Sequence, residues 1–122
     1  METVSPEIQD LSIKSLESTF NKLSNAYKSM TEKGSNTTLV KKRRNAVKID
    51  LESLKDAWNE GDFSYSYNEE SILTSKVVLQ SLLPSIEKQI EKAKEGSSQK
   101  TLNERRLTAL KLAIESLENR LK

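Results

Sequence analysis

A stretch of 17 residues occurs twice in this chain, with the two copies 63 positions apart. When residues 38–54 are aligned with residues 101–117, eight positions are identical without a gap: Thr38, Leu39, Arg43, Ala46, Lys48, Glu52, Ser53 and Leu54 recur as Thr101, Leu102, Arg106, Ala109, Lys111, Glu115, Ser116 and Leu117. A shared helical period explains the matching apolar residues, but not the identical Thr, Arg, Lys, Glu and Ser. We interpret the pattern as an internal duplication, which constrains the fold because one repeat cannot bury its apolar face alone.

The segments upstream of the two copies carry apolar seams that align at the same shift. Leu16, Phe20, Leu23, Tyr27 and Met30 fall on Leu79, Leu83, Ile86, Ile90 and Ala93, respectively. Steps of three and four residues are typical of helices that pack side by side. Short turns join antiparallel neighbours. The sequence therefore predicts an all-α fold: an antiparallel four-helix bundle made of two duplicated helical hairpins.

Capping signals give the expected boundaries of the four helices. Ser5 and Pro6 open the first helix, and Gly34 ends it in the left-handed conformation. Hydroxyl side chains are expected to cap the other three, at Thr38, Ser66 and Thr101. Pro84 is expected to kink the third helix or to split it. We predict a single domain over 1–122, with a hairpin at 5–61, a connection at 62–68 and a hairpin at 69–122.

The residue types that this sequence lacks exclude several classes of site. It contains no cysteine and no histidine, which removes thiolate and imidazole metal ligands, disulfides and the usual general base. Neighbouring carboxylates such as Glu69 and Glu70 do not face one another on a helix. We therefore expect no enzyme activity, no cofactor and no metal.

The N-terminal segment and the hydropathy pattern bear on the compartment. Residues 1–10 have neither the basic start nor the apolar run of a signal peptide. No apolar stretch approaches the roughly 18 residues of a membrane span. The expectation is a soluble, cytoplasmic protein.

A run of four cations is the sharpest local feature of the chain. Lys41, Lys42, Arg43 and Arg44 lie at the start of the second predicted helix, and the repeat retains Arg105 and Arg106. Basic runs are common on solvated helix faces, which is the simpler interpretation. The alternative is a contact with an anion or a nucleic acid, made by all six residues.

The predicted topology places both hairpin turns at one end of the bundle and segregates the charges. The segments around the turns, 28–44 and 92–106, hold 11 basic and three acidic residues and are called the basic end. The acidic end, 1–12, 50–75 and 112–122, holds 12 acidic and three basic residues. Although the net charge of the chain is only +2, its two ends would thus carry opposite charges. Such a molecule could bind an acidic partner or associate head to tail.

Aromatic residues gather in the connection between the two hairpins. Trp58 precedes it, and Phe63, Tyr65 and Tyr67 follow on alternate positions, which indicates an extended segment. The rings either cover the acidic end of the core or form a docking patch for a partner.

Three functions remain compatible with these patterns. The first is a non-enzymatic protein-protein interaction module, such as a small adaptor, regulator or immunity-type protein. The second is binding of nucleic acid or another polyanion through the basic end. The third is a self-associating structural bundle whose hairpins exchange between chains. The seam from Leu107 to Leu121 would serve either a partner or a second copy.

Overall fold

The computed structural model describes residues 4–58 and 67–122, and within these ranges it contains four α-helices and no strand. The helices are α1 (Pro6–Glu32), α2 (Thr38–Ala57), α3 (Glu69–Lys92) and α4 (Ser98–Arg120). The prediction of an all-α protein with four helices is confirmed.

Both ends of α1 follow their sequence signals. The Ser5 side chain accepts a hydrogen bond from the backbone N–H of Ile8 at 3.3 Å, and Pro6 occupies the first turn, where its missing N–H costs nothing. Gly34 follows the helix with a φ of 74°, a conformation that a side chain would strain.

The caps of α2 and α4 differ from the predicted ones. Thr38 is the first residue of α2 rather than its cap, and its N–H donates to the Asn36 side chain at 3.0 Å. The cap of α4 is Ser97, which accepts from the N–H of Lys100 at 3.1 Å, so Thr101 lies inside the helix. In α4, the hydroxyl of the extended Ser97 captures a free N–H group upstream of Thr101, and the helix begins earlier than predicted.

The cap of α3 is Asn68, whose side chain accepts from the N–H of Ser71 at 2.8 Å. Ser66, the predicted cap, lies outside the described residues. Pro84 lies inside α3, which continues unbroken from Glu69 to Lys92, so the helix is not split. Pro84 and Gln80 are both exposed, and the Gln80 carbonyl that loses its N–H partner therefore faces water.

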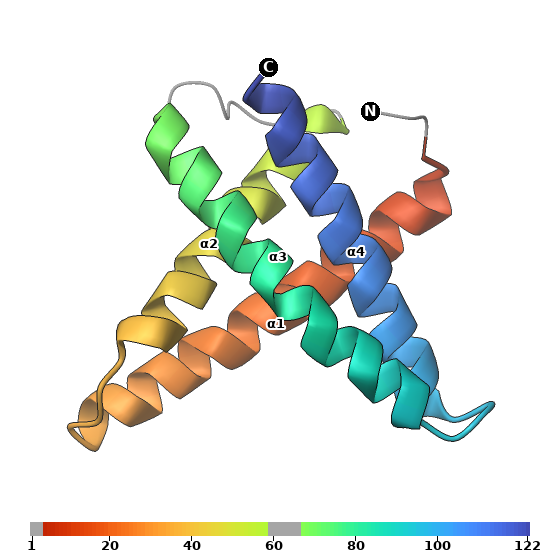
Figure 1. Ribbon diagram of the computed structural model, residues 1–122, viewed down its shortest axis with the longest axis horizontal. Helices are drawn as coiled ribbons and strands as arrows, with labels where there is room; N and C mark the ends of the chain where they lie inside the picture. The colour runs from red at the N-terminus through yellow and green to blue at the C-terminus, as the bar shows by residue number, and fades with distance from the viewer. Residues whose placement is uncertain (1–3, 59–66) are drawn as a thin grey trace.

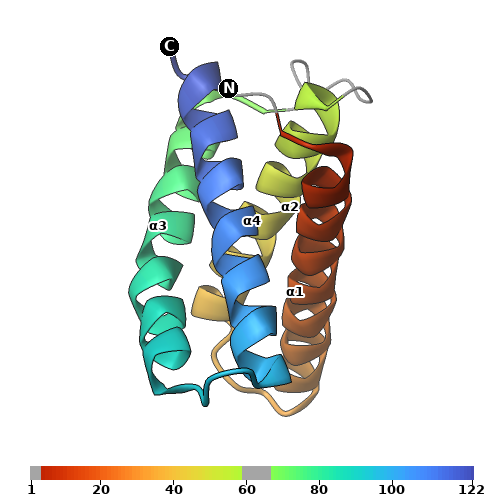
Figure 2. The same cartoon turned by 90° about the vertical axis from the view of Figure 1, so that its right-hand side faces the viewer.

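Two pairs of sequence-adjacent helices cross in an X when viewed along the short axis of the molecule (Figure 1). Figure 2 shows the turns after α1 and after α3 at one end, and the start of α1 and the C-terminus at the other. Within the described ranges, α2 and α4 contact each other and both remaining helices, whereas α1 and α3 do not touch. α2 and α4 therefore form the centre of the fold.

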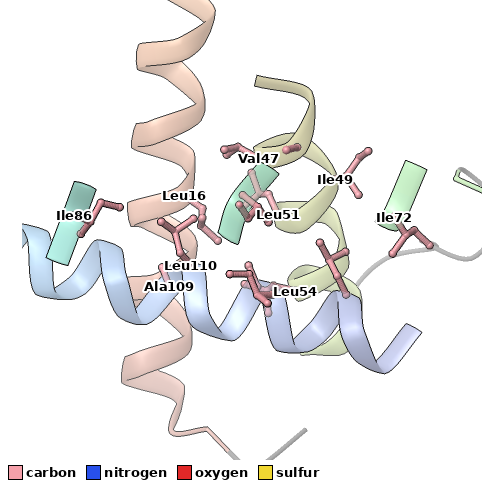
Figure 3. Packing of buried hydrophobic residues seen from close by; sticks show 14 residues of the cluster. Leu16, Val47, Ile49, Leu51, Leu54, Ile72, Ile86, Ala109 and Leu110 are labelled. Atoms are coloured by element: carbon pink, nitrogen blue, oxygen red, sulfur yellow. The ribbon is translucent and has the colours of Figure 1, made fainter. Parts of the chain in front are cut away.

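The core reflects this central position of α2 and α4 (Figure 3). Five of its 14 buried apolar residues come from α2 and five from α4: Ala46, Val47, Ile49, Leu51, Leu54, Ala109, Leu110, Ala113, Ile114 and Leu117. α1 adds Leu16, and α3 adds Ile72, Leu79 and Ile86. Each large apolar side chain contributes about 1.5–3 kcal/mol when it is fully buried.

Several pairs of residues 63 positions apart are both buried in this core. Buried pairs related by the shift are Leu16 and Leu79, Ala46 and Ala109, Val47 and Leu110, Leu51 and Ile114, and Leu54 and Leu117. The match includes polar residues, because Ser12 and Ser75 are both buried and the hydroxyls of Ser53 and Ser116 share a hydrogen bond. The last contact joins a residue to its own equivalent, as happens on a two-fold axis.

Candidate anion-binding site

The six candidate cations are distributed over different surfaces. Arg44 belongs to the packing of α2 on α1: its guanidinium lies 5.0 Å from the centre of the Phe20 ring and 5.9 Å from that of Tyr27. Its Nε donates to the Ser24 hydroxyl at 2.9 Å. Arg44 therefore stabilises the first hairpin through cation–π and hydrogen-bond contacts.

Lys41, Lys42 and Arg105 are exposed, and Lys42 and Arg105 border different hollows. Lys42 borders a surface hollow between α2 and α3 that also contains Glu70. Arg105 borders a hollow between α1 and α4 that also contains Glu104. Lys42 and Arg105 thus border different hollows of the surface, and the contact of all six cations with an anion stays a prediction.

Arg43 and Arg106 line one hollow of about 290 Å³ that is open to solvent and that we call the central cavity. Lys22 of α1, an exposed residue that is not among the six predicted cations, lines it as well. The remaining lining consists of hydroxyls and apolar side chains: Thr19, Leu23, Ser81, Leu82, Ser85, Ile86 and Leu110. The central cavity therefore carries three cations and no carboxylate.

Helical spacing explains why the two arginines reach the central cavity. Arg43 lies three and four residues before the buried Ala46 and Val47, which places it on the inward face of α2. Arg106 has the same relation to Ala109 and Leu110 on α4. The identical arginines of the repeat thus reach the same site from two helices.

The lining of the central cavity also follows the 63-residue shift. Eight of its ten residues form four equivalent pairs: Thr19 and Leu82, Lys22 and Ser85, Leu23 and Ile86, and Arg43 and Arg106. Most of its lining lies in the halves of the helices nearer the turns, which associates it with the basic end.

The three cations of the central cavity have no carboxylate partner. The ion pairs among residues 4–58 and 67–122 join Lys14 to Asp10, Lys55 to Glu17, Lys76 to Glu118, Lys100 to Glu95 and Arg120 to Asp56. None of these includes Lys22, Arg43 or Arg106, so the positive charge of the cavity is not neutralised by an ion pair in the described part of the chain.

One buried donor at the site lacks an acceptor, whereas two hydroxyls of the lining are already paired. Arg106 donates from Nη1 to the Asn103 side-chain oxygen at 3.4 Å, but its Nε is buried without a hydrogen-bond partner. The hydroxyls of Thr19 and Ser81 donate to carbonyls of their own helices, those of Ser15 and Val78. A buried donor without a partner costs about 1–3 kcal/mol, which an incoming acceptor would recover.

The two ends of the molecule to which these charges belong can be located in Figure 2. The basic end lies wholly within the described residues and contains 11 basic and three acidic residues. The described part of the acidic end contains nine acidic and three basic residues. The two turns occupy opposite corners of the basic end (Figure 1), so the central cavity lies between two cationic corners.

Two of the four aromatic candidates are described, and both pack on the core. Trp58 is half-buried and borders a hollow with Pro6 and Ile13 of α1. Tyr67 is also half-buried, and its hydroxyl donates to the Glu52 carboxylate. Burial and this carboxylate raise the pKa of Tyr67 to about 12. Phe63 and Tyr65 lie outside the described residues.

Sequence reasoning also missed Asp50, which is fully buried in α2. Neither carboxylate oxygen has a side-chain or backbone partner that meets hydrogen-bond geometry, and burial raises the pKa of Asp50 well above its ordinary value. The repeat did contain a signal, because the equivalent position holds Ala113, a residue that belongs in a core.

Two features were sought among residues 4–58 and 67–122: a cluster of metal ligands and a helix that could span a membrane. No group of three acidic side chains is placed to hold a metal ion, and none of the four described helices has a window apolar enough to cross a bilayer.

Three comparisons with known proteins were made to look for relatives of this chain. A scan against protein-family models, a search of curated proteins and a search of solved structures each found no match.

Proposed function

We propose that this protein is a non-enzymatic interaction module that binds an acidic surface of another protein through its basic end. The supporting observation is the excess of 11 basic over three acidic residues around the two turns, in a chain of net charge +2. Charge that is segregated in this way raises the rate of association with an oppositely charged partner and fixes the orientation of the partner.

Two exposed leucines favour a protein partner over a nucleic acid. Leu39 and Leu102 lie near the starts of α2 and α4, are related by the 63-residue shift, and are 60% and 40% exposed. Apolar side chains within a charged rim are typical of protein interfaces. Phosphate contacts, in contrast, use cations and polar groups.

A capture experiment with matched variants tests this proposal. The double variant Leu39→Ser/Leu102→Ser should lose a partner that wild-type protein captures from lysate, as quantified by mass spectrometry. The control Leu73→Ser/Val77→Ser removes side chains that are 49% and 56% exposed in the first half of α3 and should retain the partner. Equal capture by all three proteins contradicts the proposal.

Binding of nucleic acid or another polyanion is the second candidate, favoured by the same cations. Lys41→Glu/Lys42→Glu is the suitable variant, because Arg44 is engaged with Phe20 and Tyr27. Under this candidate, wild-type protein is retained on immobilised duplex DNA, retention falls steeply with salt, and the variant elutes early. Passage of the wild type at low salt eliminates it.

For the architecture we propose an antiparallel bundle of two hairpins that arose by duplication, forming one domain. Support comes from the equivalent burial of residues 63 apart and from the Ser53–Ser116 hydrogen bond. Self-association is the third candidate. Leu110, Ile114 and Leu117 of the predicted seam are buried within the chain, so in this candidate the basic end of one copy meets the acidic end of another. It predicts an apparent mass in light scattering that rises with concentration and falls with salt.

A further inference from the structure

We propose that the central cavity binds one phosphate monoester dianion attached to an apolar group, such as a phosphorylated side chain of the partner. The inference rests on the proposed function, because it takes the basic end as the binding end. It adds a defined pocket and a ligand chemistry that surface charge alone does not give.

The charge of the central cavity sets the charge of the ligand. Arg43, Arg106 and Lys22 bring a formal charge of +3 to a cavity without a carboxylate. A phosphate monoester carries about −1.5 to −2 at neutral pH and neutralises more of this charge than a carboxylate or a sulfate ester would.

The donor set matches a tetrahedral anion. Guanidinium groups bind phosphate through pairs of parallel hydrogen bonds, and the structure directs one guanidinium into the cavity from α2 and one from α4. Arg106 keeps a buried Nε without a partner. Ser85, in the cavity wall, makes no hydrogen bond through its hydroxyl within the described residues and is free to donate.

The apolar lining and the volume limit the rest of the ligand. Leu23, Leu82, Ile86 and Leu110 provide an apolar wall beside the cations. The 290 Å³ volume lies at the lower limit of the roughly 300–1,000 Å³ found for small-molecule sites. A phosphate with one aromatic or aliphatic group fits this space better than inorganic phosphate, which leaves the apolar wall uncovered.

Isothermal titration with O-phospho-L-tyrosine, O-phospho-L-serine, O-sulfo-L-tyrosine and inorganic phosphate tests the proposal. We expect a single saturable site for phosphotyrosine and weaker binding of the other three. Phosphoserine and inorganic phosphate lack the aromatic group, and the sulfate ester is a monoanion. Stronger binding of inorganic phosphate than of phosphotyrosine overturns the assignment of an apolar group.

Two variants with the same loss of charge separate the central cavity from general electrostatics. Arg43→Gln/Arg106→Gln should weaken phosphotyrosine binding at least about tenfold, because hydrogen bonds to a charged group are lost. Lys48→Gln/Lys111→Gln removes one exposed cation from each of the same two helices, outside the basic end, and should change binding less than about twofold, as screened surface charges do. Equal loss in both variants overturns the proposal.

Two further arms keep the test decisive. Ser85→Ala removes one hydrogen-bond donor without altering the charge, so it can replace the double arginine variant if that variant loses its helical circular dichroism. It should weaken phosphotyrosine binding about threefold or more. Unchanged binding overturns the assignment of the site. Absence of saturable phosphotyrosine binding to the wild type overturns this inference alone. The proposed function fails separately, in the leucine capture experiment.

Discussion

Buried polar residues show how single side chains depart from the repeat. Ser53 and its equivalent Ser116 satisfy one another, and Arg120 adds hydrogen bonds to the Ser53 hydroxyl at 2.6 Å and to its carbonyl at 2.8 Å. Asp50 has no such partners, and its equivalent is Ala113. A buried polar side chain in α2 is therefore fully hydrogen-bonded at Ser53, whereas at Asp50 it lacks partners and lowers the stability of the fold.

Replacing Asp50 by the residue of the other repeat should stabilise the protein. Its pKa is raised in the folded state, so the unfolded chain loses its proton first as pH rises above about 4. Wild-type stability therefore falls with rising pH until the folded pKa is passed. Asp50→Ala should raise the free energy of unfolding by about 1–3 kcal/mol at pH 7 and by less at pH 4, measured by urea denaturation.

Asp56→Ala is the matched control for Asp50→Ala. It removes a carboxylate of the same helix that pairs with Arg120 at 2.9 Å, and it should destabilise the protein at pH 7 by about 1 kcal/mol. If Asp50→Ala instead lowers the free energy of unfolding, the buried carboxyl group makes a stabilising hydrogen bond in solution.

Tyr67 gives a second prediction at the residue scale. Its pKa of about 12 reflects burial first and the Glu52 carboxylate second. Glu52→Gln should therefore lower the pKa of Tyr67 part of the way to its ordinary value of 10. The measurement is the 295 nm absorbance titration, with Tyr67→Phe used to isolate this ring. An unchanged pKa would mean that Glu52 does not contact the hydroxyl in solution.

At the scale of elements, competition between nearby capping residues decides where α4 begins. The sequence contains an attractive capping pattern at Thr101, but Ser97 lies four residues earlier and holds the N–H of Lys100. Thr101 instead directs its hydroxyl to the Ser97 carbonyl at 3.4 Å. The longer helix is favoured because every added turn contributes hydrogen bonds once nucleation has occurred.

Single alanine substitutions distinguish the two caps. Ser97→Ala should lower the free energy of unfolding by about 1 kcal/mol, the usual contribution of a capping side chain. Thr101→Ala should be neutral or stabilising by up to about 0.5 kcal/mol, because alanine has the better helix propensity in the helix interior. Thermal denaturation of both variants decides the matter, and a larger cost at Thr101 would restore it as the cap.

At the scale of the whole molecule, stability depends on the contact between the two hairpins. Val47, Leu54, Leu110 and Leu117 are almost completely buried, and α2 and α4 touch across the centre. Neither hairpin alone can cover these side chains. Folding and association of the halves are therefore coupled.

Fragments 1–61 and 62–122 test this coupling. Each alone should have low helicity at micromolar concentration or should self-associate, whereas an equimolar mixture should regain the circular dichroism of the full chain. Size-exclusion chromatography should then give one heterodimer. A fragment that unfolds cooperatively as a monomer would show that a hairpin is an independent domain.

The sequence by itself determined the helical class, the number of helices and most of the core, because apolar spacing and the repeated positions depend only on local geometry. It also singled out Arg43 and Arg106, the identical arginines of the repeat. Only the tertiary structure decided that these two residues share a cavity with Lys22, while Arg44 lies against Phe20 and Tyr27. The physical reason is that adjacent residues on a helix point about 100° apart, so the direction in which neighbouring helices cross decides which cations meet.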